Sequence, residues 1–238
     1  MPKLPKWLAN SVEALLPSQF HPVTVTEVEY LTEDLKRIRF EGNLQKTAFV
    51  PGQVIEFRVT DTEFRHYTPS FYDRGAGVCE VLFHLHGRGP GSEWAKRLRV
   101  GDRCKLMGPG GRMKFRKEAT GHFVFGDETS LGLASHLYRA AWAYGQPFSC
   151  LLELADGHED WPELIELPAT ALPENDSNIP WLLKRMDWAA APSDPGFAYY
   201  LTGRAAGIKN LVRILRERGV MNSQIQTSPY WAEGKRGL

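Results

Sequence analysis

The sequence predicts a β-barrel followed by an α/β domain: an antiparallel barrel over residues 1–120, then an open parallel sheet over residues 121–238. Two patterns lead to this fold class. In the first part, apolar and polar residues alternate with a period of two between Gly and Pro breaks, which is typical of short antiparallel strands. In the second part, short apolar runs alternate with segments of helical spacing, which is typical of a parallel sheet with crossover helices.

Alternating positions predict the strands of the barrel. Ile38 and Phe40 alternate with charged residues, and Ile55 and Phe57 alternate with polar ones, as in half-buried strands. One segment of helical spacing includes Ser92, which we predict as its N-cap. Several short strands with one helix favour a small barrel. The predicted strands are 22–30, 35–42, 53–59, 78–86 and 103–107, and the predicted helix is 91–100.

Strands and helices alternate in the second part. Gly219 is the expected C-cap of the last helix, in which apolar residues repeat at the spacing of one helix face. Residues 168–196 are rich in Pro, Asp, Asn and Ser and predict long loops around one short helix. The predicted strands are 122–126, 148–154 and 197–203, and the predicted helices are 129–144 and 205–219.

The formal net charge of +1 is the sum of a basic first part and an acidic second part. Residues 1–120 carry 19 Lys and Arg against 14 Asp and Glu, whereas residues 121–238 carry 10 against 14. Ten basic residues lie within 88–117, and eight acidic residues lie within 153–176. The basic run suits a small polyanion such as a pyrophosphate. A solvated charged surface explains both runs equally well.

Composition excludes several classes of protein. A near-zero net charge argues against a dedicated nucleic-acid binder, and no apolar stretch approaches the roughly 20 residues of a membrane span. The three cysteines, Cys79, Cys104 and Cys150, are too few for a disulfide framework or a four-cysteine iron–sulfur site. We expect buried thiols in a cytoplasmic protein without a metal site. A monomer is the expected oligomeric state.

The segment Arg65-His66-Tyr67-Thr68 combines three side chains that suit an aromatic phosphate ester. Arg65 offers a partner for phosphate, Tyr67 a stacking face and Thr68 a hydrogen bond. Ordinary alternation along a strand explains the same residues, and from these positions alone it is the stronger interpretation.

Residues 84–95, HLHGRGPGSEWA, join a strand to a helix through three glycines and a proline. Small residues allow close backbone approach, and a helix N-terminus favours an anion, so Gly91 and Ser92 are candidate anion-binding residues. The segment is neither a Walker loop nor a complete GxGxxG fingerprint. His84 and His86 share a strand face, but no third ligand has suitable spacing for a metal; lining a pocket or packing is expected.

Two strand-to-helix corners in the second part, at residues 126–130 and 201–205, are candidate nucleotide contacts. Ligands of open α/β sheets bind at the carboxyl ends of the strands. Capping turns explain these corners equally well, because Asp and Thr are common caps. A Ser-His-Asp hydrolase has little support, since the Gly-x-Ser-x-Gly elbow is absent.

Taken in order, these motifs resemble the siderophore-interacting protein family, FAD-dependent ferric-siderophore reductases of the ferredoxin–NADP reductase-like superfamily. The resemblance covers roughly residues 20–235. It is carried by four motifs in the expected order: Arg65-x-Tyr67-Thr68, His86-Gly-x-Gly-Pro-Gly-Ser92-x-Trp94-Ala95, Gly126-Asp-Glu-Thr129 and Pro229-Tyr230-Trp231-x-x-Gly234.

The resemblance implies a flavin-binding barrel and a nicotinamide-binding α/β domain. It implies that Tyr67 stacks on or beside the isoalloxazine, that Thr68 hydrogen-bonds near its reactive edge and that Arg65 meets phosphate. In the second part, Thr129 would face the nicotinamide, and Trp231 would lie near the flavin or the substrate entrance. The residues implied to hold the ribityl, pyrophosphate and adenine parts are His84, His86, Gly91, Ser92 and Trp94.

Three positions depart from the family pattern. Ser70 stands where an Arg is common, which puts one phosphate or substrate contact in question. After Gly-Asp-Glu-Thr, residues 130–133 read Ser-Leu-Gly-Leu in place of Ala-Leu-Pro-Ala. The later corner has Thr-Gly-Arg in place of Ala-Gly-Glu. Its Arg204 is suited to pair with a 2′-phosphate and favours NADPH over NADH, but capping or solvent exposure explains it too.

The implied activity is reduction of a ferric siderophore or other ferric chelate, with electrons from NADPH or NADH through FAD and release of Fe²⁺. No catalytic side chain is expected, because the flavin carries the chemistry. Lys235 and Arg236 are candidate contacts for an anionic chelate, although tail residues are more often solvated. The alternatives are a flavin reductase that serves an oxygenase or another protein, and a non-catalytic module that binds a nucleotide or siderophore.

Overall fold

The computed structural model describes residues 19–87, 89–173 and 194–234. The chain divides into two compact units, Met1–Lys114 and Phe115–Leu238. This division and the boundary predicted near residue 120 both fall between the last strand of the first unit and the first strand of the second. No helix in the described ranges is long and apolar enough to cross a membrane.

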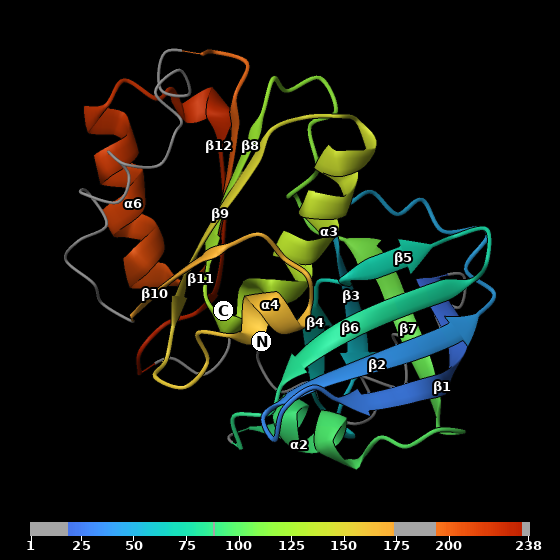
Figure 1. The fold of residues 1–238 in the computed structure, drawn as a ribbon. Coiled ribbons are helices and arrows are strands. Elements are labelled where there is room, and N and C mark those ends of the chain that lie inside the picture. The colour runs from blue at the N-terminus through green and yellow to red at the C-terminus, as the bar shows by residue number, and fades with distance from the viewer. Residues whose placement is uncertain (1–18, 88, 174–193, 235–238) are drawn as a thin grey trace. The chain divides into compact units, whose positions relative to one another are not determined.

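The first unit contains a seven-stranded sheet in the order β4-β3-β7-β1-β2-β6-β5, and every strand pairing in it is antiparallel (Figure 1). The bounds are β1 (Phe20–Tyr30), β2 (Leu35–Gly42), β3 (Val54–Arg58), β4 (Phe64–Tyr67), β5 (Phe71–Asp73), β6 (Val78–His84), α2 (Pro90–Arg97) and β7 (Arg103–Gly110).

One apolar core fills this unit, and the period-two pattern explains it. On β3, Ile55 and Phe57 are buried while their neighbours are half-buried, and Ile38 and Phe40 on β2 have no exposed surface. Because successive side chains of a strand point to opposite faces, the alternation directs one set into the core. Ala95 of α2 belongs to the same core, so the helix packs on the sheet.

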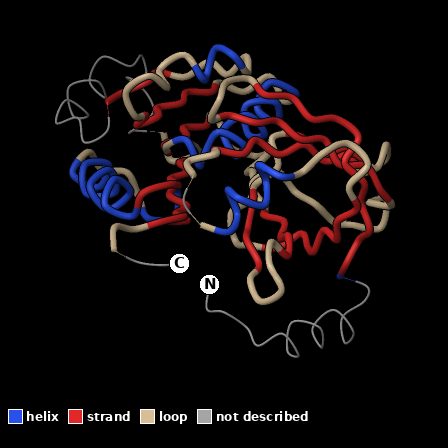
Figure 2. Tube along the Cα trace, turned by 90° about the horizontal axis from the view of Figure 1, so that it is seen from below, coloured by secondary structure: helices blue, strands red, loops and turns tan. Residues whose placement is uncertain are grey.

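The second unit contains a five-stranded parallel sheet in the order β10-β9-β8-β11-β12. Strands and helices alternate along the chain here, whereas strands dominate the first unit. Figure 2 colours the strands red and the helices blue. The bounds are β8 (His122–Gly126), η2 (Glu128–Ser130), α3 (Leu131–Ala143), β9 (Phe148–Leu154), α4 (Trp161–Leu164), β10 (Thr170–Pro173), β11 (Ala198–Arg204), α6 (Ala205–Glu217), η4 (Asn222–Gln224) and β12 (Ile225–Trp231).

Helices cover both faces of this parallel sheet, with α6 on one face and α3 on the other (Figure 1). β8, β9 and β11 are buried along most or all of their length, as expected for strands covered on both sides. The chain order reverses at β8, since β9 follows on one side of it and β11 lies on the other. Such a switch point is where open α/β sheets bind ligands, at the carboxyl ends of the strands.

The predicted fold class, an antiparallel barrel domain followed by an open parallel sheet, is confirmed. Two strands of the second unit, β10 and β12, were not predicted, and all of β10 lies in the segment that was predicted as long loops. Both contain a proline, and both are the edge strands of their sheet. Proline lacks a backbone N–H and is favoured at sheet edges and strand ends. These two strands also lack the buried apolar run that marks the central strands of this sheet. The short helix predicted within 168–196 falls mostly outside the described residues.

Helix α2 begins earlier than predicted. Its N-cap is Gly89, and Pro90 occupies the first turn, so the prediction of Ser92 as N-cap was wrong. Proline is favoured in the first helical turn because its missing N–H has no partner there in any case. At the end of α6, Gly219 follows the helix with φ of 86°, where a glycine is expected to close the last turn.

Candidate functional site

Strand β4 places Arg65 and Tyr67 on the side of the strand that faces the start of α2. Arg65 Nη2 pairs with Glu63 Oε1 at 3.1 Å, and Nη1 donates to the Phe64 carbonyl at 2.8 Å. Thr68, which follows β4, is 9% exposed. The guanidinium is therefore held in place and only partly buried, and an anion at this end of the strand would share it with the Glu63 carboxylate.

Gly91 brings the N-terminal turn of α2 against β4. A Cβ at Gly91 would lie 2.6 Å from Tyr67 Oη and 3.3 Å from Arg65 Cγ. Contacts under about 3 Å do not occur between such atoms, so this close approach requires a glycine. The predicted residues Arg65, Tyr67 and Gly91 are thus brought together, although they lie on two separate elements.

The loop before α2 is shaped by two glycines in the left-handed region, Gly87 with φ of 68° and Gly89 with φ of 86°. The Gly87 N–H donates to Ser92 Oγ at 3.2 Å, and Ser92 is 8% exposed. Ser92 therefore closes the loop from within the first turn of the helix. A Cβ at either Gly87 or Gly89 would meet no atom of the described residues within 4 Å, so the backbone at these two glycines is open on that side.

Tyr67 and Trp94 border a group of aromatic rings on the barrel core. The Tyr67 ring centroid lies 4.8 Å from that of Phe83, and the Trp94 centroid lies 5.1 Å from that of Phe57. Burial raises the pKa of the Tyr67 phenol far above its usual value, against the opposing effect of the Arg65 charge. Tyr67 is thus a neutral, partly buried ring, while the packing of Trp94 gives that residue a structural role whatever it contacts besides.

His84 and His86 lie at the end of β6, with ring centroids 5.4 Å apart. His84 is half-buried and His86 is exposed. No group of three His, Cys, Asp or Glu side chains among the described residues is arranged to hold a metal ion. Their contact with a cofactor remains a prediction.

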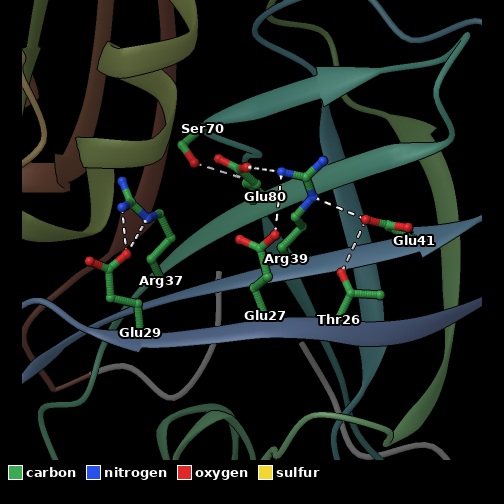
Figure 3. Close-up of polar contacts among 8 residues, drawn as sticks. All are labelled: Thr26, Glu27, Glu29, Arg37, Arg39, Glu41, Ser70 and Glu80. Atoms are coloured by element: carbon green, nitrogen blue, oxygen red, sulfur yellow. Dashed lines mark hydrogen bonds and ion pairs between the residues drawn. The ribbon is translucent and has the colours of Figure 1, made fainter.

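Ser70, the residue that replaces the Arg common in the family, bonds to the backbone of β6 instead (Figure 3). Its N–H and Oγ donate to the Glu80 carbonyl at 2.9 and 3.3 Å. Of the two guanidinium groups in this view, Arg37 pairs with Glu29, and Arg39 of β2 is surrounded by Glu27, Glu41 and Glu80 with N–O distances of 3.7, 3.2 and 3.5 Å. Carboxylates already balance both cations, so neither one takes the place of the absent Arg as an anion contact.

The residues at the junction of β4 and α2 fit a flavin dinucleotide. The N-terminal turn of α2, with an open glycine loop before it, presents backbone N–H groups to an anion. Tyr67 supplies an aromatic ring beside that turn, and Arg65 supplies a positive charge. FAD carries a diphosphate and an aromatic ring system, which are the two chemical features that these residues would hold.

In the second unit, Asp127 lies at the carboxyl end of β8, at the switch point. Its carboxylate accepts hydrogen bonds from the Thr129 N–H at 2.9 Å and from Trp231 Nε1 at 2.7 Å. It also lies against the backbone of Gly203, where a Cβ would be 2.4 Å from Oδ2. Asp127 thereby joins three predicted positions, the corners at Thr129 and Gly203 and the end of β12 at Trp231.

Asp127 is 4% exposed, and burial raises the pKa of its carboxyl, while the hydrogen bonds from Thr129 and Trp231 lower it. Hydrogen bonding to the charged form offsets part of the desolvation cost. Behind it, Thr202 Oγ1 donates to Ser130 Oγ at 2.8 Å. The two predicted corners are therefore fixed to each other by buried polar contacts. The capping turn that the sequence allowed at the first corner is present, since Asp127 is the N-cap of η2.

Arg204 is buried in an ion pair, and this changes the expectation for it. Its Nη2 lies 3.1 Å from Glu153 Oε2, and the side chains are 8% and 4% exposed. Glu233, an exposed residue, lies 3.8 Å from Nη1. Because the Glu153 carboxylate of β9 already neutralises the guanidinium, the charge of Arg204 no longer favours a 2′-phosphate. The signal for Glu153 was present in the sequence, as a charged residue within the buried strand FSCLLEL.

Glu128 connects the corner after β8 to the loop after β9. Its Oε1 accepts from the Ala155 N–H at 2.8 Å and lies 2.9 Å from His158 Nδ1. The His158 ring stacks on Trp161 with centroids 3.8 Å apart. No local sequence pattern predicts the contact between Glu128 and His158, because the two residues lie 30 positions apart in the chain. Lys235 and Arg236, the predicted chelate contacts, lie outside the described residues.

Comparison with known proteins finds a family match within the first unit. Residues 53–113 match the family model of the siderophore-interacting FAD-binding domain. The mycobactin import ATP-binding/permease protein IrtA of Mycobacterium tuberculosis is 25% identical over 232 residues, which cover 90% of this chain and 26% of that protein. The electron transfer subunit of dihydroorotate dehydrogenase B from Fusobacterium nucleatum is 27% identical over 43% of this chain and 42% of its own. The chain thus spans about a quarter to two fifths of these relatives.

Solved structures share the fold of the whole chain. The ferredoxin reductase of carbazole 1,9a-dioxygenase has a TM-score of 0.74 at 21% identity, covering 89% of this chain and 69% of its own. A siderophore utilization protein from T. fusca has a TM-score of 0.69 at 22% identity, covering 92% and 95%. The predicted resemblance is confirmed: residues 53–113 match the siderophore-interacting FAD-binding domain, and the chain has the fold of the ferredoxin reductase-like FAD- and NAD-binding proteins.

Proposed function

We propose that this protein is an FAD-dependent reductase that uses NADH or NADPH to reduce a ferric siderophore or other ferric chelate. The observation that carries the proposal is the junction of β4 and α2, where Arg65 and Tyr67 meet the turn at Gly91 within the matched FAD-binding domain. Fold likeness to siderophore utilization proteins supports the choice of substrate class.

When bound, FAD accepts two electrons as hydride and releases them one at a time, which no side chain does. In the overall reaction one NAD(P)H and two ferric chelates give NAD(P)⁺, one proton and two ferrous chelates, from which Fe²⁺ and the chelator then separate. Oxygen ligands of a siderophore are hard donors that hold Fe³⁺ far better than Fe²⁺, so reduction loosens the metal. The iron is substrate here, and the proposal requires no protein ligand to it.

The residues of the first unit bind and orient the cofactor in this proposal. The N-terminal turn of α2 would receive the diphosphate, and Arg65 would add a charge-assisted hydrogen bond. Tyr67 would pack beside the flavin ring, and Thr68 would bond near its reactive edge. Because Gly91 and Tyr67 are already in contact, ring and diphosphate positions are set by one rigid junction. His84, His86, Ser92 and Trp94 are proposed to complete the site.

The residues of the second unit are proposed to bind the nicotinamide nucleotide at the switch point. Asp127 holds Thr129 and Trp231 in fixed positions at the carboxyl ends of β8 and β12, which orients both side chains for a ligand at this edge. We propose that NADH is accepted at least as well as NADPH, because Arg204 is neutralised by Glu153. Lys235 and Arg236 are proposed contacts for the anionic chelate.

One experiment tests this function. The FAD-loaded protein is titrated anaerobically with NADH and with NADPH while flavin absorbance is followed, and ferric chelates are then added with a ferrous trap. The proposal expects bleaching by a nicotinamide nucleotide and formation of the trapped ferrous complex at about two per nucleotide consumed. Protein that binds no FAD, or binds FAD that neither nucleotide bleaches, contradicts it. The second outcome would indicate a non-catalytic binding module.

A second candidate is a flavin reductase that donates electrons to another protein. The likeness in fold to a dioxygenase ferredoxin reductase favours it. Both candidates share the flavin and nucleotide sites and differ only in the acceptor. Stopped-flow reoxidation by ferric chelates, free quinones and acceptor proteins separates them: the ferric reductase is reoxidised fastest by chelates, and the alternative by a protein.

A further inference from the structure

Lys36 occupies a position where the pattern of β2 calls for an apolar residue. The side chains of Lys36, Ile38 and Phe40 alternate into the core and are 1%, 0% and 0% exposed. A buried ammonium group costs several kcal/mol unless all its N–H groups find acceptors. A methionine of similar length would avoid that cost, so a charged side chain at this position needs a structural explanation.

That explanation lies at the C-terminal end of α2. Lys36 Nζ donates to the carbonyls of Ala95, Lys96 and Leu98 at 2.8, 3.2 and 2.9 Å. Three donors meet three acceptors, which are carbonyls that a helix end leaves without partners. The Tyr30 ring lies 4.9 Å from the same nitrogen. A positive charge at this end of the helix is also stabilised by the negative end of the helix dipole.

The opposite end of α2 is the proposed diphosphate site. The helix has eight residues and is therefore about 12 Å long. Its N-terminal turn touches β4 through Gly91, and its C-terminal turn is attached to β2 through Lys36. Contacts at both ends fix where a short helix lies along its axis and how it is rotated about that axis. They therefore also fix the direction in which its N-terminal N–H groups point.

We propose that Lys36 is a positioning residue for the cofactor: by joining the last turn of α2 to β2, it sets the place of the first turn, Gly89–Ser92, relative to Arg65 and Tyr67. This inference rests on the proposed function, because it takes the N-terminal turn as the binding site for the FAD diphosphate. Lys36 does not touch the cofactor and acts through the helix alone.

The test compares Lys36→Met, Lys36→Gln and Ile38→Ala in the full chain. Lys36→Met keeps the length of the side chain and removes all three donors, and Lys36→Gln keeps an amide donor without charge and serves if the first variant does not fold. Ile38→Ala is the matched control, because it disturbs the core from the same strand and leaves the bonds of Lys36 in place. Binding of FAD and of riboflavin, which has no phosphate, is measured by flavin fluorescence, and hydrogen exchange is followed at residues 89–93.

We expect the FAD dissociation constant of Lys36→Met to rise about tenfold, and that of Lys36→Gln to rise less, since one to two hydrogen bonds to charge correspond to such a factor. Riboflavin affinity should change less than about twofold, and exchange at 89–93 should accelerate in Lys36→Met but not in Ile38→Ala. Equal losses of FAD and riboflavin affinity, or equal FAD losses in Lys36→Met and Ile38→Ala, overturn the inference alone. Wild-type protein that binds no FAD overturns the proposed function and this inference together.

Discussion

Replacement of Gly91 by alanine tests the junction on which the cofactor site depends. Two effects oppose each other. Alanine is the better helix former, which favours the variant by at most about 1 kcal/mol. The new Cβ would lie 2.6 Å from Tyr67 Oη, and inserting one carbon into a packed contact costs about 1–3 kcal/mol. Tyr67 cannot simply swing away, because its ring lies 4.8 Å from Phe83 and 6.4 Å from Trp94. We expect net destabilisation of about 1 kcal/mol.

Tyr67→Phe supplies the control, since it removes the oxygen that the new Cβ would meet. The next nearest atoms of Tyr67 and Arg65 lie 3.8 and 3.3 Å from that Cβ, so the clash largely disappears. Gly91→Ala should therefore be neutral or stabilising in the Tyr67→Phe background, with a coupling free energy of about 1–2 kcal/mol in a double-mutant cycle.

Urea unfolding of the four proteins measures this coupling. With slopes of roughly 1–3 kcal/mol per molar, the expected loss moves the midpoint by about 0.3–1 M. FAD affinity should fall in Gly91→Ala and recover in part in the double variant. A Gly91→Ala protein as stable as the wild type, or an equal effect in both backgrounds, would refute the close contact and with it the rigid junction of β4 and α2.

Three further predictions concern the second unit. Glu153→Gln removes the buried carboxylate that pairs with Arg204, so the free energy of unfolding should fall by about 3–5 kcal/mol, and the ratio of kcat/KM with NADPH to kcat/KM with NADH should rise. The exposed control Glu163→Gln should change neither quantity. An unchanged ratio in Glu153→Gln would show that Arg204 does not reach the 2′-position. Asp127→Asn retains one acceptor oxygen, and its loss of the bond to either Thr129 or Trp231 should cost about 1–3 kcal/mol in urea unfolding and alter Trp231 fluorescence. Burial lowers the pKa of His122 below its ordinary value of 6.5, so the neutral form contributes stability that is present above pH 6.5 and declines as pH falls toward the folded-state pKa. This decline of the unfolding free energy with falling pH should be absent from His122→Gln. An equal decline in both proteins would contradict the role of His122.

Local pattern was sufficient for the central strands and helices but not for the edges. Ile38, Phe40, Ile55 and Phe57 repeat with the period of a strand, and that period is a property of the strand itself. The edge strands β10 and β12 form because β9 and β11 offer them unpaired backbone groups. That requirement comes from distant segments and leaves no local trace in the sequence.

The candidate site divides in the same way. Residue types in short motifs marked Arg65, Tyr67 and Gly91 as candidates, and the family resemblance added Thr129 and Trp231. Their contacts with a cofactor remain predictions. Their partners escaped sequence analysis, since pairings such as Trp231 with Asp127 span about a hundred residues. Arg204 shows the cost of this limit: as a residue type it predicted a phosphate contact, and Glu153, 51 positions away, changes what it offers.

Glycine marks the decisive contact in each unit. At Gly91 the missing Cβ admits Tyr67, and at Gly203, with φ of 86°, it admits the carboxylate of Asp127. In both places a polar group approaches the backbone more closely than any side chain would allow, and in both it belongs to a neighbouring element. Each of these glycines thus does more than fit its own helix or strand, because it fixes the distance to a neighbouring element of the same unit. Substitutions at Gly91 and Gly203 should therefore displace the side chains of Tyr67 and Asp127, respectively.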